Sequence, residues 1–343
     1  MLAPIIFAIL GLCVLMIVHE GGHYLAARAF KMRVTKFSIG FGPALLKRKP
    51  KDSPTTWQVA AIPLLAYVQI AGMNPLEEVD PNDKGSYANA SVTGRITTIF
   101  AGPLANYLFA SVLIFASLLM RGEQIATTRV DVMPNSPAAA AQVKSGDKIV
   151  EIGGDKVKDW EHLRSLISAH PNQQTEVVVE RDGNVMRLSV TPAVANGQAR
   201  IGVVTRVQLV PIATGRAAIL SIETPAEIVV GMVAGIGRMI AGKDKPELSG
   251  PVGIVRETAR AMKDGFAIFI YFMGVISACL AAFNLLPIPA LDGGRLMFLG
   301  YEATTRRRPD PRIEAQVHAV GLVMMLALIV FVTFAVDIPG RGH

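Results

Sequence analysis

The sequence predicts a polytopic α-helical membrane protein with about four transmembrane helices, a membrane-associated β-hairpin and an inserted β-rich domain. Its 343 residues are 51% hydrophobic and only 18% charged, and the mean hydropathy is +0.41, which is not the balance of a soluble globular protein. A formal net charge of +7 does not indicate nucleic-acid binding, because the basic residues cluster at the ends of apolar runs instead of interleaving with aromatic residues.

Four apolar segments are long enough to cross a bilayer, whose hydrocarbon core of ~30 Å needs about 20 residues of helix. They are residues 5–27, 97–119, 266–288 and 315–336. The first is a retained transmembrane helix and not a secretory signal, since it lacks a basic leader and ends in charged sequence. Cys13 and Cys279 both lie inside apolar runs, so no disulfide framework is expected.

The charged flanks predict the orientation of these helices. Residues 28–51 contain basic residues and no acidic one, and the loop after the third span carries a second basic group that includes Arg306, Arg307 and Arg308. The positive-inside rule places both loops in the cytoplasm. The N-terminus, residues 121–265 and the C-terminal tail then face outward. Binding of anionic lipid headgroups is a secondary role expected for the arginine run.

A fifth apolar stretch, residues 226–242, is expected to lie in the membrane interface and not to cross. It is shorter and carries Glu227 and Arg238, which suits an interfacial helix. If this stretch crossed the membrane, it would also reverse the orientation of the third span. We therefore assign residues 209–265 to a linker with an interfacial helix, between a first membrane core at 1–121 and a second at 266–343.

Residues 122–208 differ in kind and predict a compact β-rich domain. Four β-branched or alternating runs, a hairpin turn at Asp182 and Gly183, and a helix capped by Asp159 are all visible in this region. The stretch "MPNSPAAAAQVKSGDKIVEIGGDKV" resembles a circularly permuted PDZ domain. Such domains bind a peptide, or the outer part of a substrate, by adding it to a sheet edge; a spacer without a ligand is the alternative.

Residues 56–72, "TWQVAAIPLLAYVQIAG", suggest a strand, a break at Pro63 and a second strand near the inner end of the first span. Non-helical backbone at membrane depth is tolerated only where it is buried in protein or lines a water-filled cavity. An internal cavity is therefore expected beside this hairpin.

The first span contains "VLMIVHEGGHYLAARAF", which places His19, Glu20 and His23 inside an apolar helix. Histidines at i and i+4 project from one face and can share a metal ion. This is the HExxH pattern, in which two histidines bind Zn²⁺ and the glutamate handles the proton of a water molecule. Ionisable residues within a span are functional candidates by default, and polar packing against neighbouring helices is the structural alternative.

A catalytic zinc site usually has a third protein ligand, and the segment "FNLLPIPALDGGRL" offers Asp292. Pro287 and Pro289 break the third span just before it. The alternative role for Asp292 is capping of the following helix. Membrane depth favours a ligand, because His19 lies ~21 Å along its span at 1.5 Å per residue, near the inner side where Asp292 also falls.

Taken with "AGPLAN" at 101–106 and "SGPVGI" at 249–254, these motifs resemble the site-2 protease family of intramembrane zinc metalloproteases, over nearly the whole chain. The branch it looks most similar to is the bacterial one that cuts membrane-spanning anti-sigma factors and signal-peptide remnants. The resemblance implies that His19, His23 and Asp292 bind zinc and that Glu20 is the catalytic acid/base. It also implies substrate contacts from Asn284, Tyr67, Val68 and Pro287.

The resemblance further implies a multi-pass protein of the bacterial cytoplasmic (inner) membrane, with its active site near the cytoplasmic side. Its partners would be transmembrane substrates already shortened by another protease, so that this cut is the second in regulated intramembrane proteolysis. The lipid bilayer is a partner too, and no nucleic acid is expected.

Three departures from the family pattern are visible. The chain has room for one PDZ-like domain where some members have two, and Arg295 stands where many members have histidine. The hairpin has Leu65 and Ala66 where Gly-Gly is common, which leaves strand register and substrate range open. Two other classes of function are the alternatives: a catalytically inactive membrane-anchored PDZ adaptor, and a zinc-dependent transporter or sensor. His318 is expected to be interfacial.

Overall fold

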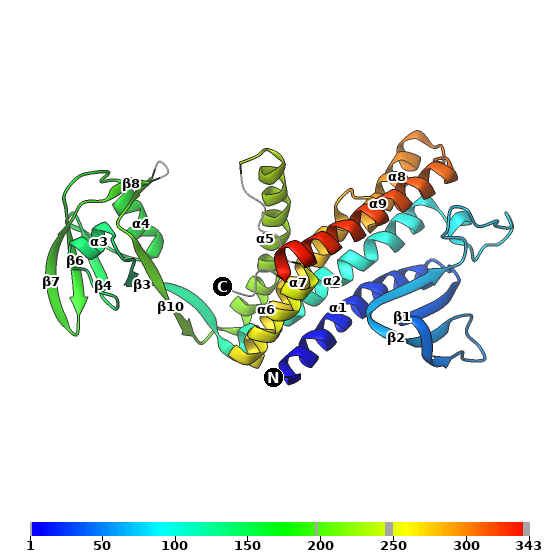
Figure 1. Ribbon diagram of the computed structural model, residues 1–343, viewed down its shortest axis with the longest axis horizontal. Helices are drawn as coiled ribbons and strands as arrows, with labels where there is room; N and C mark the ends of the chain where they lie inside the picture. The colour runs from blue at the N-terminus through cyan, green and yellow to red at the C-terminus, as the bar shows by residue number, and fades with distance from the viewer. Residues whose placement is uncertain (1, 196–197, 244–249, 339–343) are drawn as a thin grey trace. The chain divides into compact units, whose positions relative to one another are not determined.

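The computed structural model describes residues 2–195, 198–243 and 250–338. The chain forms two compact units, one made of Met1–Met120 with Ala213–His343 and the other of Arg121–Ile212. The first unit is mainly helical (Figure 1).

The helices of the first unit are amphipathic or apolar throughout and account for most of its residues. They are α1 (Leu2–Ala29), α2 (Val92–Arg121), α5 (Thr214–Ile240), α6 (Pro251–Asp264), α7 (Phe266–Leu285), α8 (Asp292–Thr305) and α9 (Pro311–Val332), with a 3-10 turn at Tyr87–Asn89 and a π-helical turn at Thr333–Asp337. Each of the four predicted spans coincides with one of them, α1, α2, α7 or α9.

By length and composition, five helices within the described residues could cross a membrane: α1, α2, α5, α7 and α9 with its π-helical extension. The additional one, α5, begins at Thr214 and continues through Pro225, whereas the sequence suggested a shorter helix from residue 226. Its placement in the interface stays a prediction. The amphipathic helix α6 was not expected within the 209–265 linker.

Helices α1, α2 and α7 pack together around small residues. Leu15 of α1 is buried in a cluster with Phe269 and Met273 of α7. The two glycines of the HExxH motif differ: a Cβ on Gly22 would overlap the backbone carbonyl of Ala101 in α2, whereas Gly21 has no neighbouring heavy atom within 4 Å of that position. Gly22 therefore allows α1 and α2 to approach closely.

A two-stranded antiparallel sheet, β1 (Val34–Arg48) and β2 (Thr56–Ile70), lies against the C-terminal half of α1 (Figure 1). Strand β1 was not predicted, because residues 34–48 were treated as part of a basic loop. Residues 56–70 are assigned as one strand, but their pairing is interrupted around the predicted break at Pro63. Between Ile62 and Ala66 the pairing register shifts, because an advance of four residues along β2 corresponds to an advance of only two along β1. Proline, which has no N–H to donate, is tolerated at such a bulge.

Both strands bend, so each half of β2 pairs with the same part of β1. Residues 36–39 of β1 pair with 56–59 on one side and with 66–69 on the other. The bend occurs at Gly40, whose φ of +92° is in a region that side chains disfavour. Residues 66–70 consequently form the outer strand of this sheet, on the side that faces α1.

The second unit is a β-rich domain whose main sheet has the strand order β10-β3-β4-β6-β7. Its strands are β3 (Glu123–Val132), β4 (Lys148–Ile152), β5 (Asp155–Lys156), β6 (Thr175–Arg181), β7 (Asn184–Val190), β8 (Ala193–Ala195), β9 (Gln198–Arg200) and β10 (Val203–Val210), with short helix α3 (Pro137–Ala140) and helix α4 (Trp160–Ser168). Val130, Ile149 and Leu163 are among the fully buried residues of its core.

Two local predictions for this domain are confirmed. Asp159 caps α4, since its Oδ1 accepts a hydrogen bond from the His162 N–H at 2.8 Å. Asp182 and Gly183 both have positive φ, at 50° and 81°, and join the paired strands β6 and β7. Such a turn matches the right-handed twist of a hairpin.

Candidate metal centre

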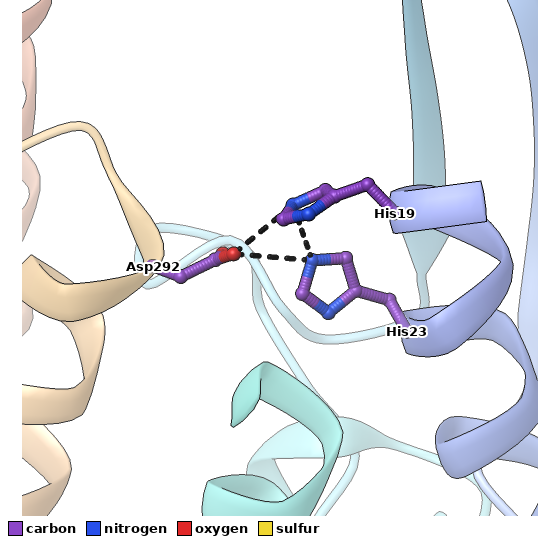
Figure 2. A group of neighbouring side chains, drawn as sticks. All are labelled: His19, His23 and Asp292. Atoms are coloured by element: carbon purple, nitrogen blue, oxygen red, sulfur yellow. Dashed lines mark hydrogen bonds and ion pairs between the residues drawn. The ribbon is translucent and has the colours of Figure 1, made fainter. Parts of the chain in front are cut away.

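Two helices bring three potential ligands to one point (Figure 2). His19 and His23 project from one face of α1, and Asp292 is the first residue of α8. Oδ2 of Asp292 lies 3.1 Å from His19 Nε2 and 3.3 Å from His23 Nε2. The two Nε2 atoms are 3.2 Å apart. All three side chains are at least four-fifths buried.

These distances match the edges of a tetrahedral metal site. Two ligands that are each about 2.0–2.1 Å from a zinc ion lie about 3.3 Å apart. Moreover, Oδ2 of Asp292 is buried with no hydrogen-bond partner among the described residues, a situation that is costly unless an ion satisfies it. Two imidazole nitrogens and one carboxylate oxygen are also the donor set that zinc prefers. The three residues therefore fit a zinc ion.

His23 is held in the tautomer that a metal requires. Its Nδ1 lies 2.8 Å from the carbonyl oxygen of Thr98 in α2, and because a carbonyl can only accept, Nδ1 carries the proton. The lone pair then remains on Nε2, which faces Asp292. Metal-binding histidines commonly make this second hydrogen bond, which fixes the ring and raises its basicity.

His19 has a corresponding neighbour in Asn106, also in α2. The Asn106 Nδ2 lies 3.4 Å from His19 Nδ1, while Oδ1 of the same amide is buried without a partner. Rotation of the amide by 180° exchanges the two atoms, and they are not distinguished by shape. In the rotated form Oδ1 accepts from the His19 Nδ1–H, and the lone pair of His19 Nε2 is free to bind metal.

Glu20 lies between the ligands and the sheet. Its Oε2 accepts a hydrogen bond of 2.9 Å from the backbone N–H of Val68. This N–H belongs to residues 66–70 of β2, the outer strand of the sheet, and points away from β1. The carboxylate next to the two histidines is therefore also at the edge of a strand.

The loop before Asp292 is packed tightly enough to fix the aspartate. Helix α7 ends at Leu285, and Pro287 and Pro289 follow. A Cβ on Gly293 would overlap the Leu286 carbonyl oxygen, so α8 begins in direct contact with this loop. The alternative role of Asp292 as a helix cap is wrong: Leu291 occupies the N-cap, and the aspartate side chain faces the histidines.

Comparison with known proteins assigns the chain to a family. A profile of peptidase family M50 matches residues 7–328. The chain belongs to peptidase family M50. A protein of Rickettsia conorii named "putative zinc metalloprotease" is 31% identical, with 95% of this chain and 96% of that protein aligned. Proteins with the same name from Mesorhizobium japonicum and a Nostoc species are each 32% identical, with 96% and 95% of this chain and 96% and 94% of those proteins aligned.

M50 membership confirms the resemblance to site-2 proteases. The other residues predicted to bind substrate lie in different settings. Asn284 donates from Nδ2 to the Leu280 carbonyl at 3.0 Å. The Tyr67 hydroxyl accepts from Gln58 Nε2 at 3.3 Å. Pro287 borders a 430 Å³ cavity on another side of the loop, with Met297 and Tyr301. Of the predicted substrate residues, Val68 is the one in contact with Glu20.

The candidate metal centre also includes contacts from residues that the sequence did not point to. Thr98 and Asn106 support the histidines, and Gly102 of α2 leaves room for them: a Cβ there would overlap the His23 ring and lie 2.9 Å from His19 Cε1. The sequence "AGPLAN" contains two of these residues. It was used only as a mark of the family, because spacing along α2 does not show what faces α1.

Proposed function

We propose that this chain is a zinc-dependent intramembrane endopeptidase that hydrolyses peptide bonds within transmembrane segments of other membrane proteins. The main support is the cluster of His19, His23 and Asp292, with Glu20 beside it at the strand edge. The names of the relatives support zinc as the ion. Zinc held by these three side chains would supply a Lewis acid that lowers the pKa of a water molecule and polarises a carbonyl group.

Glu20 is the proton carrier in this proposal. It adjoins His19 in the chain, and its carboxylate lies where an attacking water and the leaving amine would both be in reach. It takes the proton of the attacking water as the C–O bond forms, and it delivers a proton to the amide nitrogen as the C–N bond breaks. The reaction then releases one carboxylate and one amine.

The outer strand of β2 offers a place for the substrate backbone. A transmembrane helix hides its peptide bonds in internal hydrogen bonds, and hydrocarbon offers no replacement for them. An extended segment added to residues 66–70 would have partners for the groups that unwinding frees. In this position its backbone would lie beside Glu20, because the Val68 N–H already points there.

Substrates with weak helix formers in the span should therefore be preferred. Replacement of such residues by leucine, which favours helix, should slow cleavage. An unchanged rate would count against unwinding as a requirement.

The β-rich domain has a groove suited to an extended peptide. A cavity of 550 Å³ lies between α4 and β10, bordered by Trp160 and Arg164 on the helix and by Gly202 and Val203 at the start of the strand. In the described sheet β10 is an edge strand, so it can accept a further strand. This supports a PDZ-like role, in which the domain receives a peptide or a substrate's outer segment.

We assign the domain the role of a gate on the outer side of the bacterial cytoplasmic membrane. It would exclude substrates until a first protease has shortened them, so that this cut comes second. Deletion of residues 122–208 should then permit cleavage of a full-length substrate. If deletion abolishes all cleavage instead, the domain delivers substrates and the gate is refuted.

Reconstitution in liposomes tests the proposed activity against the alternative of an inactive adaptor. The purified chain is mixed with a model single-span protein, and the products are located by mass spectrometry. A zinc-dependent cut inside the transmembrane sequence is expected. Binding without a cut, at full zinc occupancy, would favour the adaptor.

A further inference from the structure

His318 of α9 contacts the loop that carries Asp292. The backbone N–H of Ala290 donates a hydrogen bond of 3.0 Å to Nδ1 of His318. Ala290 is two residues before the candidate ligand. Since Nδ1 accepts this bond, the proton of the neutral ring is on Nε2.

Ala290 needs such support because of its backbone conformation. Its φ is +73°, in the left-handed region that costs energy for any residue with a Cβ. Strained residues of this kind persist only where their surroundings hold them. The two prolines at 287 and 289 restrict φ in the loop, but neither one fixes the orientation of the 289–290 peptide, whose N–H is the one that donates to His318.

A second contact, one helical turn further along α9, holds the same loop. A Cβ on Gly321 would overlap the Pro289 side chain and lie 2.8 Å from the Pro289 carbonyl oxygen. Residues at i and i+3 lie on the same face of a helix. His318 and Gly321 thus lie on one face of α9 and contact consecutive residues of the loop. His318 accepts a hydrogen bond from Ala290, and Gly321 leaves room for Pro289.

We infer that His318 is a positioning residue of the metal centre, which acts through Ala290 to hold Asp292 toward His19 and His23. This inference rests on the proposed role of Asp292 as a zinc ligand. It makes α9 part of the site, although α9 supplies none of the three candidate ligands. Partners that hydrogen-bond a metal ligand directly change metal affinity 10- to 100-fold when they are removed; His318 acts one step further out, through Ala290, so the low end of this range is expected.

The test compares zinc affinity in full-length protein, purified in detergent, by competition with a chelator of known affinity. His318→Leu removes the acceptor, whereas His318→Asn keeps one, because the asparagine Oδ1 takes nearly the place of Nδ1. Gln316→Leu changes an exposed residue of the same helix and is the control. Thermal unfolding of each variant is measured without zinc, so that a general packing defect is seen directly.

We expect His318→Leu to bind zinc about 10-fold more weakly or worse, with unfolding of the zinc-free protein unchanged, and His318→Asn and Gln316→Leu to bind close to wild type. Gly321→Ala should weaken zinc binding through the second contact. Wild-type affinity in His318→Leu would overturn the inference, as would equal losses in His318→Leu and His318→Asn. If the wild-type chain itself binds no zinc, the proposed function fails first.

Discussion

The Nδ1–H of His23 donates to the carbonyl oxygen of Thr98 at 2.8 Å, which joins the HExxH helix to α2 at the level of the candidate metal centre. The geometry of the site therefore depends on how closely α1 and α2 approach. Glycines on both helices permit this approach, and they can be tested one at a time.

Gly102→Ala should damage the site directly. Its new methyl group would overlap the His23 ring, and the histidines cannot move without losing Thr98 or Asp292. We expect zinc affinity to fall by at least about 10-fold, measured by chelator competition. Gly300→Ala in α8, where a Cβ meets no heavy atom within 4 Å, should have little effect; equal losses in the two variants would show that the effect is not local.

Alanine substitutions at the two adjacent glycines of the HExxH motif should differ in their effect on the free energy of unfolding. Gly22→Ala places a methyl group against the Ala101 carbonyl, so it should lower the free energy of unfolding by separating the helices. Gly21→Ala meets no heavy atom within 4 Å and should be neutral or stabilise α1 by up to about 1 kcal/mol. Urea unfolding in mixed micelles measures both, and a greater loss in Gly21→Ala would contradict the packing described.

The sequence predicted the grouping of His19, His23 and Asp292 better than the structure around it. Spacing along one helix is enough to place His19 and His23 on a common face, and the prolines before Asp292 are enough to end α7. Pairing between segments is different: β1 was missed because residues 34–48 acquire their strand geometry from contact with β2 and α1. His318 was expected only to lie at the membrane interface, since its partner is a backbone N–H that no side-chain pattern reveals.

The buried ion pair between Arg95 of α2 and Glu302 of α8 should stabilise the position of α8. The two groups form paired bonds of 2.9 and 2.6 Å, and both side chains are about nine-tenths buried. Glu302→Gln leaves the guanidinium without its counter-charge and should cost about 3 kcal/mol. The double variant Arg95→Met with Glu302→Leu should recover most of the loss in urea unfolding; no recovery would mean that the glutamate acts through other contacts.

Acid should weaken the β-rich domain through Asp147. Burial opposes ionisation of this carboxyl, but hydrogen bonds from Arg181 and from the Lys144 N–H hold its pKa below the usual value. The stabilisation is complete above the unfolded pKa of about 3.9 and is lost as the pH falls through the lower folded value.

Asp147→Asn should therefore cost about 2 kcal/mol at pH 7, between the values for exposed pairs and for fully buried pairs, because Arg181 is partly exposed. The difference from wild type should shrink below about pH 4. In a Trp57→Phe background, Trp160 is the remaining tryptophan and reports unfolding of this domain. A difference that stays constant from pH 7 to pH 3 would exclude the carboxylate as its source.

In the proposed function, Glu20 moves protons at a zinc site formed by His19, His23 and Asp292. The most direct measurement compares Glu20→Gln with wild type for zinc content and for cleavage of a transmembrane substrate in the same preparation. Retained zinc with cleavage reduced by at least about 100-fold is the predicted result. Zinc retained with cleavage at the wild-type rate would contradict it.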